Sequence, residues 1–169
     1  MVLMKMVGFN MSDMKLLKNI SLLLVSFPLL LCSCSKEAPR ELPLEVSYNT
    51  ISGIWELTQW NGQELSEGSY LWMSIDRRDR KFVIYQKIDS MYGRKITGTY
   101  SLTADEVYGS IISGIYDYGA GNWANEYVVS DILPSGTMVW KVLDGESEDV
   151  SVYTKHEEIP SWVLDDCSF

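Results

Sequence analysis

The sequence predicts an all-β fold, an eight-stranded antiparallel up-and-down barrel. From residue 52 onward, short segments rich in β-branched and aromatic residues are separated by residues typical of turns. In several of these segments apolar and polar residues alternate, which is the period of a strand with one buried face. No window of the sequence carries an apolar face over three helical turns. Regularly spaced strands of this kind are typical of an all-β sandwich or barrel.

Each predicted strand is a short run between turn residues. In the second strand, Leu71, Met73 and Ile75 share one face, whereas Ser74 and Asp76 lie on the other. Several later strands carry the same alternation. The eight predicted strands are residues 53–60, 70–76, 81–88, 96–103, 106–116, 126–132, 137–143 and 148–155.

The lengths of the connections predict which end of the barrel is open. Connections after the second, fourth and sixth strands are short, and those after the first, third and fifth are longer. In an up-and-down barrel, alternate connections lie at opposite ends. The short connections are residues 77–80, 104–105 and 133–136, and the long ones are residues 61–69, 89–95 and 117–125. We therefore expect a closed floor, from which an N-terminal tether leaves, and a mouth rimmed by loops.

The N-terminal region predicts export and a lipid anchor. Lys15 and Lys18 precede an apolar run over residues 20–31, which fits the h-region of a signal peptide and is too short to span a bilayer. The following Leu31-Cys32-Ser33-Cys34 resembles the lipobox of bacterial lipoproteins. This resemblance implies that Cys34 carries the lipid and becomes the first mature residue. The alternative is an ordinary secretory signal that is cleaved nearby.

These features divide the chain into four parts. Residues 1–33 are the predicted signal peptide, and residues 34–51 hold the lipidated cysteine and a flexible tether in which prolines and charges oppose compact structure. Residues 52–156 form the predicted barrel, and residues 157–169 form a C-terminal tail. We expect the mature protein on the outer membrane, held there by its N-terminal lipid.

Charge and composition argue against several functions. The chain carries 14 Lys and Arg against 23 Asp and Glu, a net charge of −9, and removal of residues 1–33 makes this charge more negative. Such acidity is unsuited to a nucleic-acid partner. The one histidine, His156, precedes Glu157 and Glu158, which point apart in an extended chain, so no nucleophile–base pair or metal site is predicted. We expect a monomer that is not an enzyme and binds no cofactor.

Several short motifs carry a resemblance to a known family. The first strand opens with Gly53-Ile54-Trp55, and the fourth contains Gly98-Thr99-Tyr100. Together with Trp140 in the seventh strand and Tyr153 near the end of the last, these motifs resemble the lipocalin-like lipoproteins of Bacteroidota. The resemblance covers about residues 52–155.

This resemblance implies a small barrel without catalytic machinery, with Gly53 and Trp55 at its floor. The chain departs from the family pattern in two places. The Thr-Asp-Tyr motif of lipocalins is missing, and Lys155 stands where an arginine usually stacks on the tryptophan of the first strand. Because lysine lacks the planar guanidinium of arginine, the sequence alone does not establish this contact.

The loop over residues 116–125 is the best candidate for a ligand-binding element. It combines three aromatic side chains with amide and carboxylate groups on a glycine-rich segment, which suits stacking and hydrogen bonding to a ligand. Four further aromatic residues are expected near the same rim: Trp60, Tyr70, Trp72 and Tyr92. The same residues also fit a loop that only buries its aromatic rings against the rim. The candidate ligand-binding residues are Tyr116, Tyr118, Asn122, Trp123, Tyr92 and Trp72.

Two functions are compatible with these features. The first is capture of a small apolar or amphipathic ligand at the barrel mouth, which requires an empty interior. The residues expected to line that interior are Phe82, Ile84, Met138 and Trp140. The second is a protein- or glycan-interaction module that uses its aromatic rim loops and has a solid core.

Overall fold

The structure, a computed structural model, describes residues 40–146 and 149–168. The predicted signal peptide, Cys34 and the start of the tether lie outside these residues. The strands belong to one compact unit, Glu41–Phe169. Within the described residues, no helix combines the length and the apolar character needed to cross a membrane.

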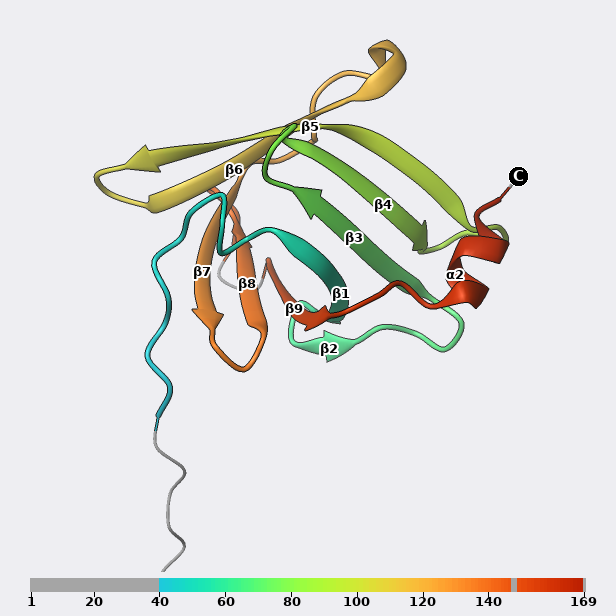
Figure 1. The fold of residues 1–169 in the computed structure, drawn as a ribbon, viewed down its shortest axis with the longest axis horizontal. Coiled ribbons are helices and arrows are strands. Elements are labelled where there is room, and N and C mark those ends of the chain that lie inside the picture. The colour runs from blue at the N-terminus through green and yellow to red at the C-terminus, as the bar shows by residue number, and fades with distance from the viewer. Residues whose placement is uncertain (1–39, 147–148, 169) are drawn as a thin grey trace, which may run out of the picture. The chain divides into compact units, whose positions relative to one another are not determined.

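The predicted fold is confirmed: the strands form a closed, eight-stranded antiparallel up-and-down barrel (Figure 1). Each barrel strand pairs with the next along the chain, and pairing between the first and last strands closes the sheet. The short β2 pairs only with the end of β1 and lies outside the cycle. The strands are β1 (Gly53–Trp60), β2 (Gln63–Glu64), β3 (Tyr70–Asp76), β4 (Lys81–Lys87), β5 (Arg94–Asp105), β6 (Gly109–Tyr116), β7 (Tyr127–Leu133), β8 (Thr137–Val142) and β9 (Val150–His156).

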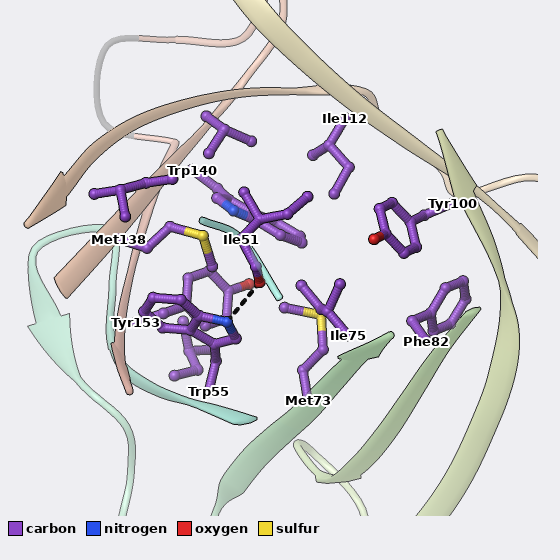
Figure 2. Packing of buried hydrophobic residues seen from close by; sticks show 13 residues of the cluster. Ile51, Trp55, Met73, Ile75, Phe82, Tyr100, Ile112, Met138, Trp140 and Tyr153 are labelled. Atoms are coloured by element: carbon purple, nitrogen blue, oxygen red, sulfur yellow. Dashed lines mark hydrogen bonds between the residues drawn. The ribbon is translucent and has the colours of Figure 1, made fainter. Parts of the chain in front are cut away.

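Alternate side chains of these strands point inward and fill the end of the barrel at which β1 begins. Trp55 is fully buried, and its indole N–H donates a hydrogen bond of 2.8 Å to the carbonyl oxygen of Ile51. Figure 2 shows this pair within the cluster that also holds Met73, Phe82 and Met138. A buried indole that keeps its hydrogen bond adds apolar burial without the cost of an unpaired donor.

The barrel's closed end is formed by the turns over residues 77–80 and 134–136, together with the segment that precedes β1. The Leu44 N–H donates to the carbonyl oxygen of Ile132 at 2.7 Å. Ile51 is fully buried in the core cluster. Residues 44–51 therefore pack on the barrel, and the packed domain begins upstream of residue 52.

Lys155 contacts Trp55 at the position where an arginine usually stacks in lipocalins. Its ammonium nitrogen lies 5.1 Å from the centroid of the Trp55 ring. Gly53, at φ +131°, makes room for this side chain, because a Cβ there would stand 2.9 Å from Cε of Lys155. The lysine thus makes a cation–π contact at the closed end without the planar stacking of an arginine.

The C-terminal tail adds a short helix, α2 (Ser161–Asp166), on the outside of the barrel (Figure 1). Val163 is fully buried, and Cys167 is nearly so, against Tyr70 and Trp72 on the outer face of β3. The Tyr70 hydroxyl donates a hydrogen bond of 2.8 Å to the Asp166 carboxylate. The tail therefore covers an aromatic patch on the wall of the barrel.

Candidate functional site

A cavity of about 670 Å³ opens at the end of the barrel opposite the closed end. Four connections contribute to its rim: those between β1 and β3, β4 and β5, β6 and β7, and β8 and β9. Asn61, Ile88, Ala124 and Asp144 represent these four connections in the lining. We call this open end the mouth and the space behind it the mouth cavity.

The walls of the mouth cavity are apolar side chains from the strands. Leu57, Leu71, Met73 and Ile84 point inward from β1, β3 and β4 and line it. Trp140, from β8, also lines it. Of the interior residues expected from the sequence, Ile84 and Trp140 thus face the space. Phe82 and Met138 instead belong to the filled core, with relative exposures of 1% and 0%.

An aromatic cluster forms one side of the cavity. The rings of Trp123 and Trp140 have centroids 5.8 Å apart, those of Tyr127 and Trp140 are 5.5 Å apart, and those of Trp140 and Tyr153 are 5.0 Å apart. Such tilted contacts orient the rings and stabilise the wall beyond simple burial. Among the described residues, the indole N–H groups of Trp123 and Trp140 have no hydrogen-bond partner.

Burial raises the pKa of two phenols in this cluster, which are protonated at neutral pH in any case. It raises the pKa of the Tyr153 hydroxyl well above the usual value for tyrosine, and it raises the pKa of the Tyr127 hydroxyl too. Desolvation disfavours the phenolate in both cases. Both protonated hydroxyls can donate hydrogen bonds.

Polar and charged side chains lie among the lining residues from the ends of the strands and from the connections. Arg94, at the start of β5, is the one cationic side chain among the described lining residues, and Asp144 and Asp149 are the anionic ones. Gln86 and Asn125 add amide groups. Apolar strand side chains together with converging polar groups suit a small amphipathic molecule.

The structure brings together only part of the predicted ligand-binding set. Tyr116 and Trp123 line the mouth cavity. Tyr118 is fully exposed in the short 3-10 helix η2 (Asp117–Gly119), and Tyr92 is 70% exposed; neither lines the cavity. Trp72 lies on the outer face of β3 against α2.

Asn122 lies in a second hollow beside β6, which has a volume of about 270 Å³. This outer hollow shares two lining residues, Trp123 and Asn125, with the mouth cavity.

Several cavity residues were missed in the sequence. Tyr127 and Tyr153 lie in predicted strands, but Val128 follows Tyr127 and Val152 precedes Tyr153, so alternation of apolar and polar residues does not mark their inward faces. Arg94 fell in a predicted connection, although it begins β5. Its place in the lining depends on pairing with Gln86 of β4, which no local pattern reveals.

The one histidine lies away from the mouth cavity. Its imidazole Nε2 is 2.9 Å from a carboxylate oxygen of Glu56, and its ring centroid is 4.7 Å from that of Trp72. In the part of the chain that the structure describes, no three His, Cys, Asp or Glu residues are grouped to hold a metal ion.

The fold and cavity define a class of protein: a small antiparallel β-barrel that is filled at one end and hollow at the other. In comparisons with known proteins, no family model, no curated protein and no solved structure matches this chain. The resemblance to lipocalin-like lipoproteins stays a prediction from the sequence motifs.

Proposed function

We propose that this protein is a lipid-anchored, lipocalin-like binding protein of the bacterial cell envelope that captures a small apolar or amphipathic ligand at its mouth. The observation that carries the proposal is the mouth cavity of about 670 Å³, within the usual range for small-ligand sites. Its apolar walls favour an apolar portion of the ligand, and Arg94, Asn125 and the two carboxylates favour a polar end near the opening.

Ligand capture can be tested by blocking the cavity. Leu71→Trp places a large ring in the space, whereas Thr103→Trp, at an exposed position of β5, adds the same ring outside it. We expect the wild type and Thr103→Trp to bind 1-anilinonaphthalene-8-sulfonate, with enhanced dye fluorescence, and Leu71→Trp to lose this binding. Equal binding by all three proteins would contradict ligand capture in the barrel.

The natural ligand can be sought directly. Native mass spectrometry of the protein purified from its own host should show an added mass that disappears on denaturation. The Leu71→Trp variant purified in the same way should lack this mass. Retention of the mass by this variant would place the bound molecule elsewhere.

The proposed anchor has an independent test. Labelled palmitate fed to the host should be incorporated into the wild type and into Cys32→Ser, but not into Cys34→Ser. Incorporation into Cys34→Ser would assign the lipid to another residue. An outer-membrane location should be lost together with the label.

A second candidate function is supported by the exposure of Tyr118. A fully exposed aromatic side chain on a loop is suited to contact a protein or glycan partner. If this rim loop binds a partner, Tyr118→Ala should abolish partner recovery in a pull-down, while Leu71→Trp leaves it unchanged. Recovery that is insensitive to Tyr118→Ala counts against this alternative.

A further inference from the structure

The barrel wall has a gap in its hydrogen-bond ladder between β6 and β7. These strands pair only over Ser110–Ile112 of β6 and Tyr127–Val129 of β7. On its other edge, β6 pairs with β5 along its whole length, from Gly109 to Tyr116. The rest of β6, Ser113–Tyr116, therefore has an edge that β7 leaves free.

The connection between β6 and β7 folds back along this free edge. The Trp123 N–H donates to the carbonyl oxygen of Gly114 at 2.8 Å, and the Tyr116 N–H donates to that of Gly121 at 2.8 Å. A single bridge pairs Ile115 with Asn122. These bonds hold Trp123 at the point where the ladder between β6 and β7 is missing.

Gly114 provides the space that the Trp123 ring occupies. A Cβ at Gly114 would collide with Cε2 of the indole and lie 2.6 Å from Cδ2, so a larger residue there would displace the ring. On the inside of the barrel, the indole centroid lies 5.1 Å from that of Phe82 and 5.8 Å from that of Trp140. The ring therefore packs against the backbone of β6 and reaches the core aromatic residues.

The indole also belongs to the walls of two hollows. Both hollows have mixed walls, in which apolar and aromatic side chains stand beside hydroxyl, amide and carboxylate groups. Trp123 and Asn125 line both. The polar residues that line the outer hollow are Thr99, Ser101, Ser113, Asn122, Asn125 and Glu126.

We propose that Trp123 is a specificity-determining partition, which limits the length of the ligand by closing the barrel wall where β6 and β7 separate. This inference rests on the proposed function. The ligand is an amphiphile whose apolar part ends against the indole within the mouth cavity. Removal of the indole joins the two hollows, so that a longer chain extends through the gap toward the outer hollow.

The partition can be tested with a series of amphiphiles of increasing length. Octanoate, dodecanoate and hexadecanoate are titrated as competitors of bound 1-anilinonaphthalene-8-sulfonate. In Trp123→Ala, the affinity for hexadecanoate relative to octanoate should rise by about tenfold over the wild type, which corresponds to about two more accommodated methylene groups. Trp123→Phe retains a smaller ring, so its affinity for hexadecanoate relative to octanoate should lie between those of the wild type and Trp123→Ala.

Two further variants separate the partition from a general effect on the loop. Gly114→Ala keeps the indole but displaces it from the wall, so it should change the length preference in the same direction as Trp123→Ala. Tyr118→Ala removes an aromatic ring from the same loop at a fully exposed position, and it should keep the wild-type preference.

Two results would overturn the partition. If the wild type binds the dye and the acids but Trp123→Ala keeps the wild-type length preference, including the case in which all three affinities change by the same factor, the indole does not limit the ligand and the partition alone is wrong. If the wild type binds neither the dye nor the acids, the proposed function is wrong and the partition fails with it.

Discussion

The two ends of the barrel are built from the same strands but differ in what fills them. At the closed end, Trp55 and Met138 are fully buried, and Ile51 adds a buried side chain from outside the strands. At the mouth, the inward positions of the same strands surround a cavity of about 670 Å³. Alternation gives both ends inward-pointing apolar side chains, but at the closed end large strand residues and Ile51 pack together and, among the described residues, leave no such cavity.

This difference predicts that the closed end determines stability and that the mouth determines ligand binding. Substitutions at the closed end should lower the free energy of unfolding, because they remove packed atoms and leave voids. Substitutions in the mouth cavity should change ligand binding at a smaller cost in stability, because each of these side chains borders the cavity on one side and packs against the core on the others. The following predictions test this difference.

The largest effect is expected for Trp55→Ala. The change leaves a void in the filled core and removes both the indole contact with Lys155 and the hydrogen bond to Ile51. We expect a loss of about 3–5 kcal/mol in the free energy of unfolding, measured by urea denaturation. Leu57→Ala, at a residue that lines the mouth cavity, should cost less. Equal costs would contradict the difference between the two ends.

A loss of about 2–5 kcal/mol is expected for Ile51→Ala, because this fully buried residue anchors the segment before β1. Leu42→Ala is the control in the same segment. Leu42 is 80% exposed, so its substitution should change the free energy of unfolding by less than about 0.5 kcal/mol. If both variants are as stable as the wild type, residues 44–51 do not contribute to the closed end.

The closed end should also respond to alkaline pH through Tyr100. Burial, followed by the nearby Tyr48 and Asp76, raises the pKa of the Tyr100 hydroxyl to about 12. Because the folded-state pKa exceeds the unfolded value of about 10, the contribution of Tyr100 is complete below about pH 10 and falls as the pH rises toward 12. Denaturation curves across this range should show a smaller alkaline loss for Tyr100→Phe than for the wild type. Parallel losses would contradict the assignment.

The smallest effect is expected for Lys155→Met, which keeps the length of the side chain but removes its charge. Loss of the cation–π contact with Trp55 should cost about 0.5–1 kcal/mol, measured by the same denaturation assay. Lys155→Arg keeps a cation and should retain most of this stability. A methionine variant as stable as the wild type would show that the ammonium group adds nothing to the closed end.

Most of the barrel could be predicted from the sequence because its signals are local. The observed bounds of β1 and β3 coincide with those predicted, since turn residues flank each alternating run. The pairing of β1 with β9 joins distant parts of the chain and followed only from the barrel topology. The turn between β5 and β6 lies further along the chain than predicted: β5 continues to Asp105, and β6 begins at Gly109. The reason is that the Asp105 carboxylate accepts hydrogen bonds from the N–H groups of Val107 and Tyr108, which fixes the turn after Asp105. These bonds also lower the pKa of Asp105.

The candidate site could be predicted less well. The sequence located the open end and two lining residues, Tyr116 and Trp123, because connection lengths and a glycine-rich aromatic loop are visible locally. Trp72 was expected at the rim, although it shares a strand face with Ser74 and therefore points outward. The partner that buries this outer face is α2, a helix too short to leave an amphipathic pattern.

The helix that covers β3 has a practical consequence. Cys167 is the one cysteine in residues 41–169, and its thiol is shielded beside Tyr70. A thiol-reactive reagent can modify it only when the tail detaches. In a chain that begins at Glu41, the modification rate of Cys167 would therefore report how often the C-terminal tail detaches from β3. Comparison of this rate with the rate of global unfolding would show whether the tail detaches by itself.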